Sequence, residues 1–160
     1  MIDITRSSIF NLYPLVVAVF MRLTRNVAAF IRTARVAHLA TADAKGQPHV
    51  IPICFVFDGK EFFSPVDEKP KQTPPTQLKR LRNITANSKV SLVIDRYHEE
   101  WRRLAYVLVT GKARIVLRGA KHASAVKRLR TKYPQYRQMA IDQRPMIAIR
   151  PERLKSWGSI

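Results

Sequence analysis

The chain has 160 residues, a length typical of one domain, and 46% of them are hydrophobic, an ordinary fraction for a globular protein. Its charge is unusual, because 29 lysines and arginines stand against 11 aspartates and glutamates and give a net charge of +18. Such a chain favours a negatively charged partner, which could be nucleic acid, an anionic membrane or a polyanionic small molecule. The single cysteine excludes an intrachain disulfide, and the four histidines lack the close spacing of a zinc or iron site.

Residues 1–25 are expected to be an N-terminal extension that is either helical or added by an early start codon, which leaves 26–160 as the domain. The apolar run over 10–21 contains Asn11 and Pro14 and is well short of the about 20 residues that span a membrane. It also lacks the basic start and the small-residue cleavage pattern of a signal peptide. We therefore expect a cytoplasmic protein without stable membrane insertion.

Hydrophobic periodicity predicts short strands and helices from residue 27 onward. DAKG at 43–46 and Asp58-Gly59 are turn signals between the first three strands, so these strands should pair antiparallel. Gly111 interrupts an unusually long strand and indicates a bulge or a bend there. The predicted elements are a helix over 27–34 capped by Asn26, strands over 36–42, 48–57 and 61–66, a helix over 75–86, strands over 89–95 and 104–117, a helix over 119–132, and a strand over 145–149 followed by a tail.

These elements indicate a mainly β fold with attached helices, in which six antiparallel strands form a closed or nearly closed barrel. Of the isolated residues, Cys54 is interpreted as a buried inert thiol and His49 as a polar residue on a sheet face or at a dimer contact, with contact to a ligand as the alternative. His98 and His122 are expected to be solvated. Trp157 is expected to cap the barrel.

The segment over 61–87 is expected to carry the main binding site. A strand leads through acidic and proline-containing positions into a helix, for which Thr73 or Thr76 could supply the N-cap hydroxyl. Free backbone N–H groups, the positive end of the helix and basic side chains could converge there on a phosphate. A solvated basic helix is an equally good interpretation. The basic residues concerned are Lys69, Lys71, Lys79, Arg80 and Arg82.

Several kinds of catalytic and phosphate-binding motif are missing from the sequence. The five glycines lie far apart, so neither a dinucleotide-binding turn nor a phosphate-binding loop can be built from them. No serine lies in a nucleophile elbow, and the carboxylates are too sparse to suggest an acid–base pair. No catalytic side chain is therefore expected, and an enzyme of this kind would depend on a cofactor.

Four stretches stand out by their order and spacing: VAHLATADAKGQPHVIPICFVFDGKEFFSPVDEKPK, LKRLRNITANSKVSLVIDRYHEEW, VTGKARIV and PERLKSWG. Together they resemble the flavin and deazaflavin split-barrel oxidoreductases, the superfamily that includes pyridoxamine phosphate oxidase. The resemblance covers about 27–158 and is closest to the branch that depends on coenzyme F420. The stretch QTPPTQ is longer than the corresponding link in that family, so the roles of the threonines within it do not follow from the resemblance.

The resemblance implies a six-stranded split barrel that forms a homodimer, with a flavin-like cofactor in a groove at the subunit interface. It implies that the backbone of Ser64, Pro65 and Val66 lies under the cofactor ring and that Lys69 and Lys71 bind its phosphate. It also implies that Asn83 in the following helix contacts the cofactor. Two aromatic residues, Tyr97 and Trp101, would come from the second subunit.

The expected function is hydride transfer between reduced F420 and a small conjugated organic acceptor, with FMN as the alternative cofactor. The high positive charge suits the multiply anionic tail of F420 better than the single phosphate of FMN. Two other interpretations stay open. One is an FMN- or haem-binding protein of the same fold without F420 activity, and the other is a nucleic-acid-binding protein that uses the segment 101–141, which contains no Asp or Glu.

Overall fold

The computed structural model describes residues 23–67 and 78–160. Most of the expected N-terminal extension lies outside this part of the chain, as do Lys69 and Lys71. The strands are β1 (Ala37–Ala42), β2 (Pro48–Ile53), β3 (Val56–Phe57), β4 (Phe62–Pro65), β5 (Lys89–Arg96), β6 (Ala105–Val116) and β7 (Met146–Gly158). The α-helices are α1 (Arg25–Thr33), α2 (Lys79–Ala86) and α3 (Ala120–Lys132), and the short 3-10 helices are η2 (Trp101–Arg103), η3 (Pro134–Arg137) and η4 (Ile141–Gln143).

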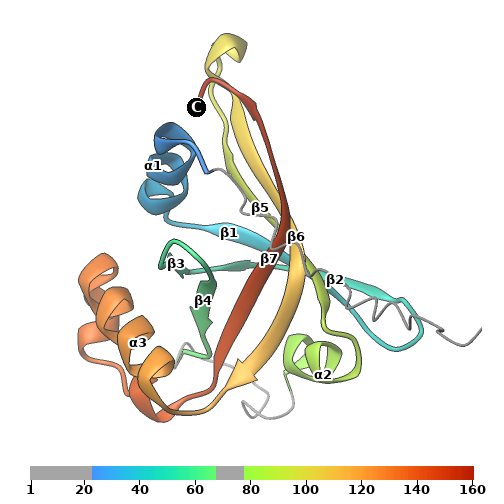
Figure 1. Cartoon of the computed structure of the whole chain (residues 1–160), viewed down its shortest axis with the longest axis vertical. Coiled ribbons are helices and arrows are strands. Elements are labelled where there is room, and N and C mark those ends of the chain that lie inside the picture. The colour runs from blue at the N-terminus through green and yellow to red at the C-terminus, as the bar shows by residue number, and fades with distance from the viewer. Residues whose placement is uncertain (1–22, 68–77) are drawn as a thin grey trace, which may run out of the picture.

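The seven strands of the described residues form one antiparallel sheet in the order β2-β1-β5-β6-β7-β4-β3. The two edge strands, β2 and β3, are consecutive in the chain and are separated only by Cys54 and Phe55. Three peptide steps join Ile53 to Val56 and can span at most about 11 Å. The opposite edges of the sheet must therefore lie close together, and the sheet curls into a half-barrel (Figure 1). The expected mainly β fold with attached helices is confirmed.

Two strands differ from the sequence prediction. The expected strand over 48–57 is divided into β2 and β3, because the chain crosses there from one edge of the sheet to the other and buries Phe55 completely. The last strand continues to Gly158 instead of ending at Ile149, and it pairs with β6 over the whole length of β6. Most residues beyond Ile149 are exposed, so this half of β7 has no hydrophobic pattern that could predict a strand.

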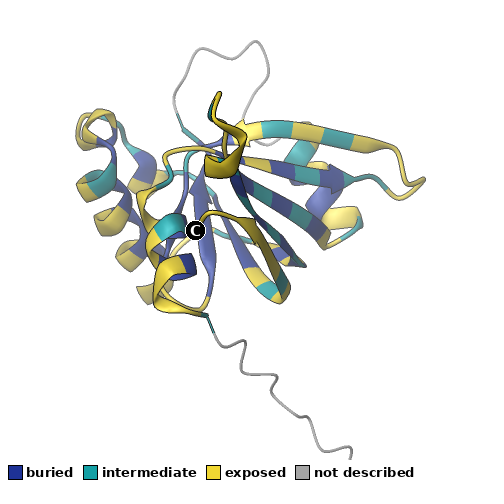
Figure 2. Cartoon of the chain, turned by 90° about the horizontal axis from the view of Figure 1, so that it is seen from above, coloured by how far each residue is buried: buried dark blue, intermediate teal, exposed yellow. Residues whose placement is uncertain are grey.

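The core lies on both faces of the curled sheet. Phe62 and its neighbour Phe63 in β4 point to opposite faces, as alternation along a strand requires, and each belongs to a different apolar cluster. The larger cluster fills the inside of the half-barrel and includes α1 and α2, whereas the smaller one lies under α3. Figure 2 shows the resulting alternation of buried and exposed residues along the strands.

The first two helices begin differently from the prediction. Helix α1 is capped by Thr24, whose hydroxyl accepts a hydrogen bond of 3.2 Å from the Val27 N–H, and not by Asn26, which lies within the helix. Helix α2 begins at Lys79, with Leu78 at the N-cap position and no side-chain cap. The two threonines expected to cap it, Thr73 and Thr76, lie outside the described residues. The N-cap residue Leu78 has no side chain that could accept a hydrogen bond from the first turn of α2.

Gly111 marks a break in the pairing of β6 with β7, as predicted. The register shifts between Thr110 and Gly111. A Cβ atom on Gly111 would lie 2.2 Å from the carbonyl oxygen of Arg150, so only glycine allows the two strands to approach this closely. Within 23–67 and 78–160, no helix is long and apolar enough to cross a membrane.

Candidate functional site

The start of α2 is held against β1 by a buried polar chain. Asn83 is 3% exposed, and its side-chain Nδ2 donates a hydrogen bond of 3.0 Å to the hydroxyl of Thr41 in β1. The Thr41 hydroxyl in turn donates a bond of 3.4 Å to the carbonyl oxygen of His49 in β2. Leu81 and Ile84 anchor the apolar side of the helix in the core. Two strands and one helix are thus fixed around one point.

Two nitrogen atoms next to this chain are buried and have no hydrogen-bond partner within the described residues, namely His49 Nδ1 and Arg80 Nε. Burial lowers the pKa of His49, and the positive charges of Lys79 and Arg80 lower it further. Burial also lowers the pKa of the Arg80 guanidinium, although the nearby Asp67 opposes this shift. An unpaired buried polar atom costs about 1–3 kcal/mol, so a partner group that reached either nitrogen would stabilise this region.

We call Thr41, His49, Asp67, Arg80 and Asn83 the α2 site. These residues come from β1, β2, α2 and the position two residues after the end of β4. The first turn of α2, with the positive end of the helix dipole, and the exposed Lys79 add positive charge. The arrangement offers donors and positive potential but no pair of carboxylates. It is therefore suited to binding an anion and not to acid–base chemistry by its own side chains.

The predicted residues Ser64, Pro65 and Val66 lie directly before Asp67. The side chains of Ser64 and Val66 are buried, so this segment presents mainly its backbone. On one side the segment pairs with β7, and the Val66 N–H donates a bond of 2.9 Å to the Pro145 carbonyl. On the other side, the pairing with β3 ends at Phe63. This edge of the segment has no strand partner among the described residues.

Tyr97 and Trp101 lie at the opposite end of the molecule from α2, in the connection between β5 and β6 that contains η2 (Figure 1). Their side chains are 68% and 76% exposed. One chain therefore brings Asn83 close to the other residues of the α2 site but does not bring the two aromatic residues there. The predicted phosphate ligands Lys69 and Lys71 lie outside the described residues.

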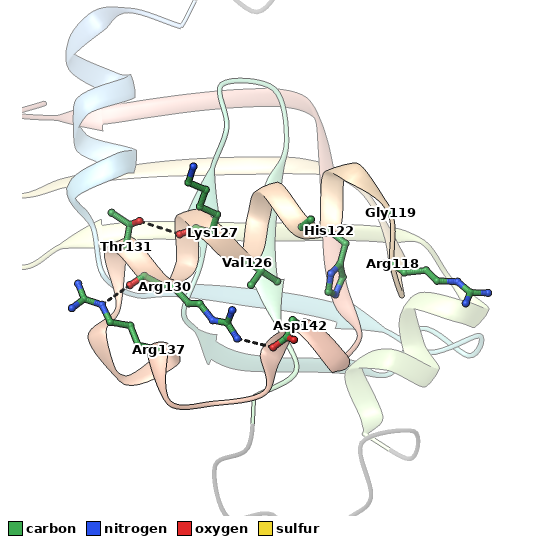
Figure 3. A pocket seen from close by; sticks show the side chains of 10 residues that line it. Arg118, Gly119, His122, Val126, Lys127, Arg130, Thr131, Arg137 and Asp142 are labelled. Carbon is green, nitrogen blue, oxygen red and sulfur yellow. Dashed lines mark hydrogen bonds and ion pairs between the residues drawn. The ribbon is translucent and has the colours of Figure 1, made fainter.

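A hollow of about 600 Å³ lies between α3 and the segment of η3 and η4 (Figure 3). Two of its charged groups bind each other, because Arg130 donates to Asp142 over 2.6 Å, and Arg130 also donates to the carbonyl oxygens of Tyr136 and Met139. His122 is 4% exposed, and its Nε2 lies 2.9 Å from the Arg144 carbonyl oxygen, so the expectation that it is solvated was wrong. His122 lies on the inner side of α3, and its ring contacts the loop that contains Arg144. These bonds hold the hollow together and leave the α2 site as the better candidate.

Sequence reasoning missed residues that position the α2 site. Tyr136 is buried, and its hydroxyl donates a bond of 3.2 Å to Asp67 Oδ2, so α3 and its following turn fix the segment after β4. Burial is also the main cause that raises the pKa of Tyr136. Thr41 gave no signal beyond its place in a strand. Asn83 was reached only through the family resemblance, because a helical asparagine has no pattern of its own.

The segment 101–141 does not form one continuous basic face. Its first residues lie on η2 at one end of the molecule, and its last residues lie on and after α3 at the other (Figure 1). Arg114 and Lys121 both bind the carboxylate of Glu61, and Lys112 lies 3.5 Å from Glu152. Carboxylates from other parts of the chain thus neutralise part of this segment. Within 23–67 and 78–160 there is no group of three or more residues suited to hold a metal ion.

Residues 23–158 match the family model described as pyridoxamine 5'-phosphate oxidase. No curated protein matches the sequence. Among solved structures, the conserved hypothetical protein Rv2991 of Mycobacterium tuberculosis is 22% identical with a TM-score of 0.68, covering 83% of this chain and 82% of its own. The haem storage protein HutZ of Vibrio cholerae is 18% identical, with a TM-score of 0.64 and coverage of 86% and 95%. An F420 reductase is 24% identical, with a TM-score of 0.57 and coverage of 79% and 92%. These likenesses show a shared fold.

Proposed function

Because the chain belongs to the pyridoxamine 5'-phosphate oxidase family, we propose that it is a homodimeric oxidoreductase in which hydride passes between reduced coenzyme F420 and a small conjugated organic acceptor. The observation that carries this proposal is the pair of buried nitrogens, His49 Nδ1 and Arg80 Nε, which lack a partner within the described residues. They lie beside the start of a helix whose N-cap residue, Leu78, makes no side-chain hydrogen bond to the first turn. A similar fold in an F420 reductase supports the choice of cofactor.

The residues of the α2 site fit the acidic part of such a cofactor. Arg80 and Lys79 would neutralise a phosphate at the start of α2, and the family resemblance assigns Lys69 and Lys71 to the same group. His49 is mainly neutral at pH 7 because its pKa is lowered below its usual value of 6.5, and so it can contact a ligand without adding a charge. Asn83 and Thr41 keep α2 in place on the sheet.

The unpaired edge of Ser64–Val66 would lie under the ring of the cofactor. Its buried side chains and its bond to Pro145 make this edge rigid, which favours a fixed ring orientation. The cofactor supplies the hydride chemistry when it is bound. The protein supplies orientation, exclusion of water and neutralisation of negative charge.

The dimer in this proposal would cover the outer face of the sheet formed by β1, β2, β5, β6 and β7. Along these strands both apolar and polar residues point away from the core, and Val50 and Trp157 are 59% and 52% exposed. A second copy on this face would also bring its own Tyr97 and Trp101 to the complex, which one chain cannot place at the α2 site. The apolar outward residues include Ala40, Val50, Pro52, Val93, Tyr106, Leu108 and Trp157, and the polar ones include His38, Ser91, Asp95, Thr110 and Lys155.

The test is a fluorescence titration of the protein with F420, compared between Arg80→Met and Arg82→Met. Both changes remove one positive charge from α2, but Arg82 is exposed and is not part of the α2 site. We expect Arg80→Met to weaken binding by tenfold or more, since a charged hydrogen bond contributes about 1.5–3 kcal/mol. Arg82→Met should change it by less than about threefold. No F420 binding by the native protein, or equal effects of both variants, would contradict the proposal.

Haem binding is the second candidate function, and the unpaired Nδ1 of His49 favours it, because a neutral imidazole nitrogen is a common ligand of haem iron. The same half-barrel occurs in a protein described as a haem storage protein. Adding haem and recording the visible spectrum separates the two candidates. A strong haem absorbance band that disappears in His49→Ala, together with no response to F420 or FMN, would support the haem-binding function instead.

A further inference from the structure

A second hollow, of about 560 Å³, lies between α3 and the end of α1. Val56 and Phe57 of β3 belong to its lining, but both are buried and offer almost no apolar surface to a partner. The side chains that are exposed around the hollow are all polar, and none is a carboxylate. They are Arg32 from α1 and Ser124, Lys127, Arg128 and Thr131 from α3. A partner at this hollow would therefore meet positive charge and hydroxyl groups.

The three cations around this hollow make no ion pair among the described residues. Neither α1 nor α3 contains an aspartate or a glutamate. The ion pairs that α3 makes within the described part of the chain use other side chains, since Lys121 binds Glu61 and Arg130 binds Asp142. The positive charge at the hollow is thus exposed and uncompensated, unlike much of the charge elsewhere on α3.

The exposed residues of α3 at this hollow form one stripe along the helix, because they recur at spacings of three and four residues. His122, Ala125, Val126 and Leu129 are buried on the other side. From Ser124 to Thr131 the stripe is about 10 Å long, at about 1.5 Å per residue. A DNA duplex carries one negative charge per about 1.7 Å of its axis, so about 10 Å of duplex presents about six charges. Several phosphates could face the stripe at once.

The side chains around the hollow favour a duplex over a single strand or a membrane. Single strands gain affinity by stacking bases on aromatic rings, but the exposed aromatic residues Tyr97, Trp101 and Trp157 all lie outside α1 and α3. A helix that lies on a membrane buries an apolar face in the lipid. The apolar face of α3 is already packed in the smaller core cluster. What the hollow offers is contact with a regular row of phosphates.

We propose that this surface, made of Arg32, Ser124, Lys127 and Arg128, binds the sugar-phosphate backbone of double-stranded DNA. The three cations pair with phosphates, and the Ser124 hydroxyl, which makes no hydrogen bond among the described residues, donates to a phosphate oxygen. The Thr131 hydroxyl is already used, since it donates a bond of 3.0 Å to the Lys127 carbonyl oxygen. Contacts of this kind do not read the base sequence. We call these four residues the α1–α3 surface, which shares no residue with the α2 site.

The test measures the fluorescence anisotropy of a labelled DNA duplex of about 20 base pairs, or two helical turns, over a range of salt concentrations. The logarithm of the binding constant should fall linearly with the logarithm of the salt concentration, with a slope of about −3 or steeper for three phosphate contacts. The double change Lys127→Gln and Arg128→Gln should make the slope shallower by about two and weaken binding by about tenfold or more at about 0.1 M salt. A scrambled duplex of the same length should bind equally well.

The matched control is the double change Arg102→Gln and Arg103→Gln, which removes two exposed charges from η2 at another end of the molecule (Figure 1). It should leave the affinity within about threefold of the native value and the slope nearly unchanged. Equal effects of the two double variants would show that the +18 charge of the chain attracts DNA in general, and would overturn the proposal. Absence of duplex binding at about 0.05 M salt would overturn it as well.

Arg32→Gln tests whether α1 and α3 contact the same duplex. This single change should make the slope shallower by about one, as expected when one phosphate contact is lost. An unchanged slope would reject the part of α1 in the surface. The same titrations with a single strand of equal length and with phosphatidylglycerol vesicles test the other two classes of partner. Tighter binding to either one than to the duplex, lost in the Lys127 and Arg128 double variant, would reassign the surface and overturn the proposal.

Discussion

At the scale of single residues, polar groups in this protein fall into two kinds. Some are buried and fully paired, such as Glu61, which is 6% exposed and binds both Arg114 and Lys121. Others are buried and unpaired within the described residues, such as His49 Nδ1 and Lys132 Nζ. Paired groups hold elements together, whereas unpaired groups are an energetic cost that a ligand can remove. The proposed cofactor site at α2 follows from this difference.

Glu61 should make the stability of the protein fall in acid. Its pKa is lowered to about 2, mainly by the hydrogen bond from Arg114, and also by Lys121. The folded-state pKa is below the ordinary 4.5, so the stabilisation is complete above pH 4.5 and is lost as the pH falls towards 2. Glu61→Gln should lower the free energy of unfolding at pH 7 by about 1–3 kcal/mol, measured by urea denaturation, and should flatten the loss between pH 4.5 and 3.

Asp142→Asn is the control for this prediction, because it removes a carboxylate from an ion pair whose two side chains are 37% and 50% exposed. Exposed pairs contribute little, so this change should cost less than about 1 kcal/mol. If Glu61→Gln were no more destabilising than Asp142→Asn, the ion pairs of Glu61 would not stabilise the junction of β4, β6 and α3.

At the scale of elements, the long strands β6 and β7 approach closely at the bulge because Gly111 lacks a side chain there. Gly111→Ala would place a Cβ atom 2.2 Å from the Arg150 carbonyl oxygen. The two strands would have to separate, and we expect a loss of about 1–3 kcal/mol or more in the free energy of unfolding. Gly46→Ala is the comparison, because its φ of 83° disfavours alanine although no atom lies within 4 Å. It should cost about 1–2 kcal/mol, and a neutral Gly111→Ala would show that the bulge does not need glycine.

The sequence predicted most elements where one face of a strand or helix is apolar. β5 alternates buried and exposed residues, and α3 repeats apolar residues at helical spacing, so both were found close to their true bounds. The second half of β7 is polar and mostly exposed, and only its pairing with β6 makes it a strand. The α2 site could be predicted only in part, because it depends on contacts between segments that are far apart in the sequence. The cationic start of α2 was visible, but the contact between Tyr136 and Asp67 joins residues that no local pattern connects.

At the scale of the whole molecule, the half-barrel has one face that none of the three α-helices of the described residues covers. Leu108 lies near the middle of this face, opposite Val93 on one side and Lys155 on the other. In the proposed homodimer this face becomes an interface, and a stable interface of this kind typically buries about 1,600 Å² in total. The +18 charge of each chain opposes association, so apolar contact on this face must outweigh the repulsion.

Leu108→Asp should therefore convert the dimer into a folded monomer, because it would place a carboxylate in the centre of the apolar interface. The native protein should sediment with twice the mass of one chain in analytical ultracentrifugation, and the variant should sediment with the mass of one. Leu117→Asp introduces the same change at a residue that is 65% exposed and lies beyond the end of β6, and it should leave the dimer intact. A native protein that sediments as a monomer would contradict the dimer.

The position of β7 has a consequence for synthesis on the ribosome. It is the last strand to be translated, yet it lies between β6 and β4 in the finished sheet. Until it emerges, the nascent chain holds two separate pieces, β2-β1-β5-β6 and β4-β3, each with an open edge that can pair with a neighbouring polypeptide. A premature stop codon anywhere before Met146 would thus release a product prone to aggregation.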